Sequence, residues 1–184
     1  MNITILGPGA IGCLYAYKLH QAGHRVSVWG RTPQDSVTIA LDDASALDLP
    51  NRNIDLLTQS DLVIVTLKAW QVESALKPLL EHLSNDTILL FLHNGMGTVE
   101  RLASSITHFP VLLGTSTHGA LKLSNSRFSH TGLGQTFIGA GNDKGSCCSF
   151  IADVLNHAFN PAGWHDNIQT ALWTKLVINC AINR

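Results

Sequence analysis

The stretch Asn2-Ile-Thr-Ile-Leu-Gly-Pro-Gly-Ala-Ile-Gly12 decides the fold of this chain. Its first five residues are uncharged and rich in β-branched side chains, which is typical of a strand buried in a parallel sheet. Glycine ends this run at Gly7, and helix-forming residues continue from about Ala10 to Ala22, where Gly23 is well placed to end a helix. The order of strand, glycine turn and helix predicts the first half of a βαβ unit.

The same alternation continues through the first half of the chain. Arg25–Trp29, Asp61–Leu67 and Thr87–Leu92 have the pattern of strands, and a helix is expected from about Trp70 to Leu83. Strands joined by helices of this length pair in parallel through crossover connections. We therefore predict an α/β protein with a Rossmann-type, doubly wound and mostly parallel sheet. Residues 36–53 show a weaker pattern and are expected to be irregular, with one short strand at most.

The sequence changes character from about Val111, where short β-like pieces are joined by Gly, Ser and Asn. These pieces are Val111–Thr115, Arg127–His130 and Gln135–Ile138. This pattern predicts antiparallel strands added to one edge of the sheet. Residues 146–159 are expected to be helical, residues 162–165 to form a short strand, and a last helix to begin near Asn167.

Composition and charge argue against several classes of protein. The chain has 184 residues, 45% of them hydrophobic, and 12 Lys and Arg residues against 13 Asp and Glu residues, without runs of one sign. This near balance argues against a nucleic-acid groove or an anionic membrane surface as a partner. At roughly 100–200 residues per domain, the chain is long enough for one sizeable core and the start of a second domain.

The cysteines, histidines and apolar runs favour a cytoplasmic protein without a metal. Of the four cysteines only Cys147 and Cys148 are close, and adjacent cysteines do not readily form a bridge or clamp a metal, so reduced thiols are expected. The nine histidines lack metal-binding spacing. The first apolar run, Ile3–Leu6, has no basic start, and no run reaches the roughly 18 apolar residues of a membrane span.

The glycine loop is expected to bind the pyrophosphate of a nicotinamide dinucleotide. Gly7 permits the tight turn, Gly9 lets the phosphates approach the backbone, and Gly12 lets the helix pack close to the strand. The helix N-terminus adds N–H groups and a partial positive charge. The cofactor-binding residues predicted in the loop are Gly7, Pro8, Gly9, Ala10, Ile11 and Gly12. A glycine-rich turn without a ligand is the alternative.

The residues after the second strand indicate which dinucleotide binds. NAD-specific sites usually have an acidic residue about 20 residues beyond the loop, where it accepts hydrogen bonds from the ribose. This chain has Gly30-Arg31-Thr32 there. Because a guanidinium pairs with a 2′-phosphate and offers no acceptor to an unmodified ribose, we predict NADP(H) rather than NAD(H). A solvated loop cation is the other interpretation of Arg31.

Polar residues also follow two other predicted strands. Lys68 comes directly after Leu62–Leu67, and Asn94 follows Leu89–Leu92. Both are expected at the cofactor crevice, because open α/β sheets hold their ligands at the carboxyl ends of strands. A solvated lysine and a turn-forming asparagine before glycine are the alternatives.

The last helix carries a polar stripe. Lys175, Asn179 and Asn183 recur every four residues and share one arc of the helix. Leu172, Leu176 and Ile178 lie at other angles and are free to face the core. The stripe is interpreted either as the polar wall of a substrate pocket or as a solvent-facing helix edge.

Five segments of the chain form a set that points to one family. They are Gly7–Gly12, Thr66-Leu-Lys-Ala-Trp-Gln71, His93-Asn-Gly-Met-Gly-Thr98, Gly114-Thr-Ser-Thr-His118 and Leu172-Trp-Thr-Lys-Leu-Val-Ile-Asn-Cys-Ala-Ile-Asn183. Together they resemble the 2-dehydropantoate 2-reductase, or ketopantoate reductase, family over the whole length of the chain. The resemblance implies NADPH-dependent reduction of 2-dehydropantoate to (R)-pantoate, a step toward pantothenate and coenzyme A.

The resemblance also implies roles for individual residues. Lys175 matches the catalytic lysine of the family, and Asn179 and Asn183 match its substrate-binding asparagines, with Asn94 between substrate and cofactor. The residues implied to line the cofactor are Gly7, Gly9, Gly12, Arg31, Lys68, Asn94 and Ala120. During reduction an alkoxide develops on the substrate, and a nearby ammonium can stabilise that charge and supply the proton. Such a lysine works best with its pKa lowered, which burial achieves.

Members of this family continue past the last of these asparagines into an all-helical second domain that adds substrate contacts. We therefore divide the chain into an NADP-binding domain, residues 1–165, and the start of the helical domain, residues 166–184. We expect this chain alone to bind NADPH but to reduce ketopantoate slowly. The alternatives are another NADP-dependent 2-keto acid or polyol-phosphate dehydrogenase of the same architecture, and a non-catalytic NADP-binding sensor module.

Overall fold

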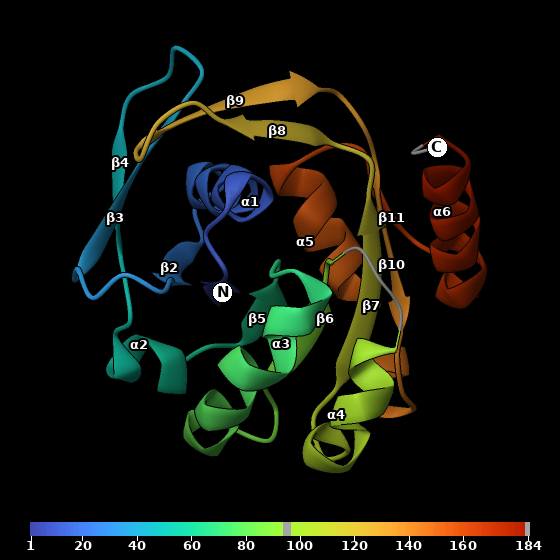
Figure 1. Cartoon of the computed structure of the whole chain (residues 1–184). Helices are drawn as coiled ribbons and strands as arrows, with labels where there is room; N and C mark the ends of the chain where they lie inside the picture. Colours follow the sequence, from blue (N-terminus) through green and yellow to red (C-terminus); the bar gives the residue numbers. More distant parts are fainter. Residues whose placement is uncertain (94–96, 183–184) are drawn as a thin grey trace.

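The computed structural model describes residues 1–93 and 97–182 and contains two sheets (Figure 1). The predictions for Asn94 and Asn183 lie outside these residues. The larger sheet has seven strands in the order β11-β10-β7-β6-β5-β1-β2. They are β1 (Asn2–Leu6), β2 (Arg25–Trp29), β5 (Leu62–Val65), β6 (Ile88–Phe91), β7 (Val111–Ser116), β10 (Thr136–Ala140) and β11 (Ala162–Trp164).

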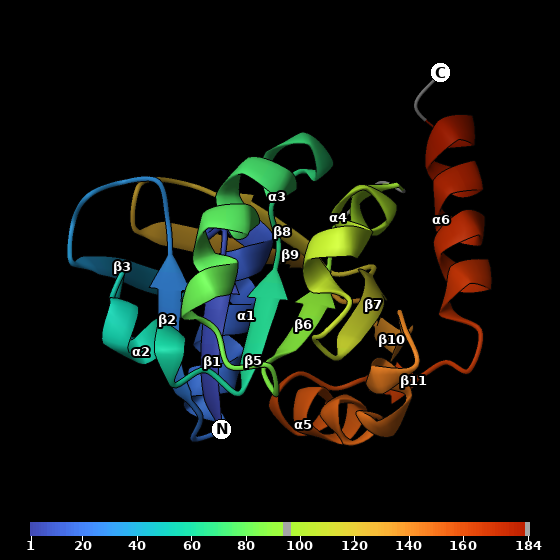
Figure 2. The ribbon, with the colours of Figure 1, turned by 90° about the horizontal axis from the view of Figure 1, so that it is seen from below.

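The larger sheet is parallel from β2 to β7, as the sequence predicts. Strand β1 pairs in parallel with both β2 and β5, and β6 and β7 continue in parallel beyond β5. Strand β10 runs antiparallel to β7 and pairs in parallel with β11 at the edge (Figure 2). The prediction of a Rossmann-type sheet with an antiparallel addition at one edge is therefore confirmed.

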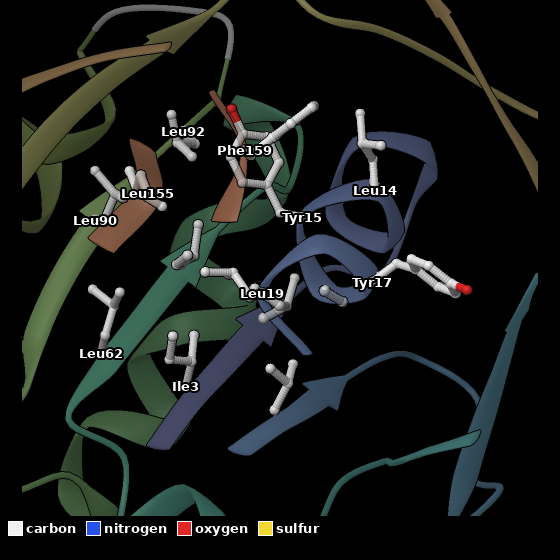
Figure 3. Packing of buried hydrophobic residues seen from close by; sticks show 14 of the residues in the cluster. Ile3, Leu14, Tyr15, Tyr17, Leu19, Leu62, Leu90, Leu92, Leu155 and Phe159 are labelled. Atoms are coloured by element: carbon white, nitrogen blue, oxygen red, sulfur yellow. The ribbon is translucent and has the colours of Figure 1, made fainter. Parts of the chain in front are cut away.

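The helices explain why the central strands are buried on both faces. They are α1 (Ala10–Gln21), α2 (Ile54–Thr58), α3 (Ala69–Leu76), α4 (Thr98–Ile106), α5 (Phe150–Ala158) and α6 (Ile168–Ile182), with 3₁₀-helices at Lys77–His82 and Lys144–Cys147. Leu90 belongs to a core cluster with residues of α1 and α5 (Figure 3), and so does Ile64. Their neighbours Val65 and Phe91 belong to a cluster with residues of α3 and α4. Because successive side chains of a strand point to opposite faces, this sheet has a core on each side.

Helix ends agree with the sequence at some positions and differ at others. Helix α1 ends before Gly23, whose φ of +89° is in the left-handed region that favours glycine. The helix expected to reach Leu83 changes to a 3₁₀-helix at Lys77, where Pro78 occupies its first turn. The helix expected from Ser146 begins as a 3₁₀ turn and becomes an α-helix only at Phe150. The sequence did not predict helices α2 and α4 or strand β8.

The second sheet departs most from the expectations. It has four strands in the order β4-β3-β9-β8, namely β3 (Ser36–Leu41), β4 (Leu47–Pro50), β8 (Gly119–Lys122) and β9 (Arg127–Gly132). The expectation that residues 36–53 are irregular is wrong, and residues 127–130 do not join the edge of the larger sheet. The reason is packing, since Ile39, Leu41 and Phe128 are buried in the cluster that contains α1. Figure 1 shows β8 and β9 passing over α1, which is therefore covered on two sides.

The structure also shows the state of the cysteines and allows a search for metal-binding groups and membrane-spanning helices. All four cysteines are free, and burial raises the pKa of the Cys13 thiol to about 12, which keeps it protonated. Within residues 1–93 and 97–182, no group of three or more His, Cys, Asp or Glu side chains is placed to hold a metal ion. No helix in the described part of the chain is long and apolar enough to cross a membrane.

Candidate active site

The carboxyl ends of β1 and β5 form the centre of the site. From β1 the chain continues to β2 on one side and later to β5 on the other, and open α/β sheets bind ligands in the crevice at such a switch point. Gly7 follows β1, and its N–H donates to the carbonyl of Trp29 at the end of β2 (3.1 Å). On the other side, Thr66 Oγ1 donates to the carbonyl of Gly7 (2.7 Å). The glycine loop is therefore anchored to both neighbouring strands.

Each glycine of the loop has the surroundings that its predicted role requires. Gly7 has a φ of +94°, a conformation that favours glycine. A Cβ atom at Gly12 would lie 2.3 Å from the Gly7 oxygen and 2.6 Å from Thr66 Oγ1, so α1 approaches the loop only because this residue has no side chain. A Cβ atom at Gly9 would meet no heavy atom within 4 Å, so the backbone there faces open space.

The first turn of α1 opens onto the same space. Gly9 is the N-cap of α1, so no side chain of the cap residue pairs with the N–H groups that a helix leaves free at its start. These N–H groups and the positive end of the helix dipole are suited to an anion. The residues present therefore fit the pyrophosphate of a dinucleotide.

Arg31 is exposed in the turn directly after β2. A Cβ atom at Gly30 would lie 3.1 Å from Pro8 Cγ, so this turn lies against the glycine loop. Gly30 N–H donates to Oδ1 of Asn51, a side chain that is only 2% exposed. Arg31 thus lies where a residue that distinguishes the two ribose types is expected. Sequence reasoning missed Asn51, because a single asparagine in a weakly patterned segment carries no signal.

Lys68 and Ala120 lie in different parts of the fold. Lys68 is the N-cap of α3, just beyond β5, and its exposed Nζ lies 5.0 Å from the centre of the Trp70 ring. Ala120 lies on β8, next to an irregularity in the pairing of β8 with β9, and packs against the cluster around α1. Lys68 therefore lies beyond the carboxyl end of β5, the strand next to β1, and Ala120 belongs to the second sheet.

Lys175 reaches the sheet from α6. Its Nζ donates to the carbonyl of Ser116, the last residue of β7 (2.6 Å). Burial lowers the pKa of Lys175, because the ammonium loses hydration. This direction is the one expected of a lysine that gives up a proton near neutral pH. Sequence reasoning missed the Ser116 carbonyl, since a main-chain acceptor has no sequence signal.

A cavity opens beside this lysine-bearing helix. It is small, with a volume of about 30 Å³, and its lining comes from the end of β6, from β7, the start of α4, and the first turns of α6, including Phe91, Glu100 and Leu172. Thr98 also lines it, and Thr98 Oγ1 is buried without a hydrogen-bond partner in the described part of the chain. An unused buried hydroxyl at an apolar cavity is suited to a polar ligand group.

The sequence pattern of the family described as Ketopantoate reductase PanE/ApbA matches residues 3–143. The chain belongs to this family. A 2-dehydropantoate 2-reductase of Vibrio cholerae is 56% identical over 183 residues, which is 100% of this chain and 62% of the relative. The structure of a PanE/ApbA family ketopantoate reductase from Ralstonia eutropha has a TM-score of 0.81 at 25% identity, over 98% of this chain and 62% of that chain. A complex of D-mandelate dehydrogenase with NADH has a TM-score of 0.80 at 25% identity, over 97% of this chain and 60% of that chain.

The ketopantoate reductase family match divides the candidate residues into two groups. Residues 3–143 include the glycine loop, Arg31, Lys68 and Ala120, whereas Lys175 lies beyond them. The alignment with the Vibrio cholerae relative covers the whole chain and so includes α6. The chain spans about three fifths of the length of the relatives that it matches.

Helix α6 carries Lys175 and Asn179 of the predicted polar stripe. Asn179, one turn beyond Lys175, is half-buried. Leu172 packs against the core cluster that contains residues of α3 and α4. Ile178 is 51% exposed and so does not face the core, although its angle on the helix left it free to do so. Figure 2 shows the reason, because α6 stands beside the β10 and β11 edge of the sheet and its later turns extend beyond it.

Proposed function

We propose that this chain is part of an NADP(H)-dependent oxidoreductase that reduces 2-dehydropantoate to (R)-pantoate, in the route to pantothenate and coenzyme A. The observation that carries the proposal is Lys175, whose ammonium is held on the Ser116 carbonyl at the carboxyl end of β7 and has a lowered pKa. The glycine loop follows the carboxyl end of β1, which belongs to the same parallel sheet. A dinucleotide site and a proton donor on one edge of a sheet are what such a reduction requires.

The cofactor site is proposed to hold NADP(H), which supplies the hydride when it is bound. The loop Gly7–Gly12 binds the pyrophosphate through backbone N–H groups. Arg31 pairs with the 2′-phosphate through its guanidinium. Lys68, Asn94 and Ala120 complete the proposed lining of the cofactor.

Lys175 is proposed as the catalytic residue. The substrate oxygen gains negative charge as the keto group is reduced to an alcohol, and the ammonium of Lys175 stabilises this charge and then transfers a proton from Nζ to the oxygen. Asn94, Asn179 and Asn183 are proposed to bind the substrate through their amides. The lowered pKa of Lys175 favours the transfer at neutral pH.

Helix α6 is proposed to be the first helix of a second, helical domain. On this division residues 1–165 form the cofactor domain and residues 166–184 begin the substrate domain. The α6 side chains of Trp173 and Val177 are 56% and 64% exposed, and such apolar side chains are suited to packing against further helices. We therefore expect this chain alone to bind NADPH but to reduce ketopantoate slowly.

A Lys175→Ala substitution tests the catalytic role in a protein that carries this chain together with the helical domain. We expect kcat for ketopantoate to fall by about 10²- to 10⁴-fold, with NADPH affinity nearly unchanged. Lys77→Ala is the matched control, because the ion pair of Lys77 is with the exposed Glu73 of the same helical segment (2.8 Å). Full activity of the Lys175→Ala protein would refute the role.

Calorimetric titration of this chain with NADPH and NADH tests the cofactor. We expect NADPH to bind more tightly by about tenfold or more, because the charged hydrogen bonds of Arg31 go to the 2′-phosphate. Arg31→Ala should remove most of this preference. Equal or tighter binding of NADH by the unsubstituted chain would overturn the proposal of NADP(H).

The likeness to D-mandelate dehydrogenase with NADH supports a second candidate. This candidate is a dehydrogenase of the same architecture that acts on another 2-keto acid or on a polyol phosphate. A substrate screen separates the two, since faster turnover of another keto acid than of ketopantoate favours the second. A non-catalytic NADP-binding sensor is a third candidate, and turnover by the protein with its helical domain would exclude it.

A further inference from the structure

The turn that carries Arg31 is held by one buried side chain. Oδ1 of Asn51 accepts a hydrogen bond from Gly30 N–H (2.8 Å), and Nδ2 of Asn51 donates to the carbonyls of Thr32 (3.1 Å) and Gln34 (2.6 Å). Asn51 is 2% exposed, so these bonds form away from water. The amide thus uses its acceptor and both hydrogens on the backbone on either side of Arg31.

The main chain of residues 51 and 52 reinforces the same turn. Asn51 N–H donates to the carbonyl of Asp35 (2.7 Å), and Asn51 forms an isolated parallel bridge with Val28 of β2. Arg52 N–H donates to the carbonyl of Val28 (3.1 Å), and Arg52 Nη1 donates to the carbonyl of Gly30 (3.2 Å). Both ends of the turn are therefore hydrogen-bonded to residues 51 and 52.

The turn at residues 30–34 is also fixed relative to the glycine loop. Gly30 lies against Pro8, since a Cβ atom at Gly30 would be 3.1 Å from Pro8 Cγ and 3.4 Å from Asn51 Oδ1. Gly7 N–H donates to the carbonyl of Trp29, the residue before Gly30 (3.1 Å). The position of Asn51 thus determines where the backbone of Arg31 stands relative to the start of α1.

We propose that Asn51 is a specificity-determining positioning residue, which fixes the turn at residues 30–34 so that Arg31 meets a ribose 2′-phosphate of a dinucleotide bound at the glycine loop. The proposal rests on the proposed dinucleotide site and adds a residue that acts through Arg31 without touching the ligand. A long exposed arginine loses conformational freedom when it pairs with a phosphate, and a fixed backbone reduces that cost. A side chain that lacks the two N–H donors of Asn51 leaves the Thr32 and Gln34 carbonyls without these partners.

Asn51→Ala tests the proposal with two ligands that differ only in the 2′-phosphate, namely adenosine 2′,5′-bisphosphate and adenosine 5′-monophosphate. We expect the unsubstituted chain to prefer the bisphosphate and Asn51→Ala to lose about tenfold of this preference in calorimetric titration. Affinity for the monophosphate should change little. A loss of affinity for both ligands in equal measure would show a merely structural role and overturn the proposal.

Asn53→Ala is the matched control. It removes another asparagine oxygen from the same segment, one whose hydrogen bond comes from Leu56 N–H at the start of α2 (3.0 Å) and not from the turn. This variant should keep the preference for the bisphosphate. In an Arg31→Ala background, adding Asn51→Ala should not change the preference further, and a further tenfold change would overturn action through Arg31.

Two outcomes separate this proposal from the proposed function. If the unsubstituted chain shows no preference for the bisphosphate, the NADP(H) proposal itself fails. If the chain prefers the bisphosphate and Asn51→Ala keeps that preference, only the role of Asn51 fails. Should Asn51→Ala not fold, hydrogen exchange of the unsubstituted chain decides, because slow exchange of the Gly30 N–H without ligand supports the held turn and exchange at the rate of an unprotected amide refutes it.

Discussion

The two ends of the candidate site are built in different ways. At β1, the glycine loop is defined by backbone geometry, with Gly7 at positive φ and Gly12 in contact with the loop and with Thr66. At β7, the site depends on one side chain, Lys175, which reaches the Ser116 carbonyl from a helix whose later turns are partly exposed. From this comparison we expect that atoms added to the glycine loop disrupt the structure at β1. A change in the charge of Lys175 should instead alter the properties of the site at β7.

Gly12→Ala should give the largest effect on stability. The added Cβ would lie 2.3 Å from the Gly7 carbonyl oxygen, a backbone atom that cannot move without disturbing β1 and α1. We expect the free energy of unfolding in urea to fall by about 3 kcal/mol, with loss of dinucleotide binding.

Gly9→Ala is the control for this substitution at the same loop. Its Cβ meets no atom within 4 Å and its φ of −79° suits alanine, so stability should change by less than about 0.5 kcal/mol. Dinucleotide affinity should still fall, because the methyl group occupies the space proposed for the phosphates. A Gly12→Ala chain as stable as the Gly9→Ala chain would contradict the steric account of the loop.

The difference between the β1 and β7 ends also explains how much of the fold and of the site the sequence could predict. The β1 end was predicted almost residue by residue, because its strand, glycines and helix are adjacent in sequence and each has a local signal. The second sheet was not predicted, because β3 pairs with β9 across a long separation, with Ala40 opposite Arg127, and is stabilised by packing on α1. The spacing of the last helix indicated Lys175 but not which carbonyl it meets. It also left the exposure of Ile178 open, because that exposure depends on what α6 packs against.

His118 lies two residues beyond Ser116, at the β7 end of the site. It allows a pH-dependent test in which the expected effect on stability is of intermediate size. Nδ1 of His118 accepts from Gly134 N–H (3.0 Å), and the ring stacks on Phe159 with centroids 3.8 Å apart. Burial, and to a lesser extent His130, lowers the pKa of His118 from 6.5 to about 4. The unfolded chain therefore binds the proton first as pH falls, so stability should decrease between pH 6.5 and about 4.

Urea unfolding across this pH range measures the contribution of His118. We expect the unsubstituted chain to lose about 1 to 2 kcal/mol more than His118→Gln, which keeps a hydrogen-bond acceptor but does not titrate. A difference between the two chains that stays constant with pH would show that His118 titrates in the folded chain as it does in the unfolded one. The stability of the folded chain would then not depend on His118 being neutral.

Apart from the Gly9→Ala control, Lys175→Met should have the smallest effect on stability, and the sign of this effect distinguishes the two ends most clearly. Because burial lowers the pKa of Lys175 below the ordinary value of 10.5, the unfolded chain holds this proton more tightly, and burial of the ammonium opposes folding at neutral pH. The hydrogen bond to the Ser116 carbonyl offsets part of this cost. We expect the Lys175→Met chain at pH 7 to match the unsubstituted chain or to exceed its free energy of unfolding by up to about 1 kcal/mol. As pH rises through the folded-state pKa toward 10.5, the unsubstituted chain should gain stability relative to the variant.

Urea unfolding of both chains between pH 7 and pH 10.5 measures this change. A large loss of stability in Lys175→Met at pH 7 would identify the lysine as a structural anchor of α6 and remove support for its catalytic role. A small gain, together with lost turnover in the protein that carries the helical domain, would show that the lysine is kept at a cost to stability. Gly12 would then be required by the fold itself, and Lys175 only by the reaction.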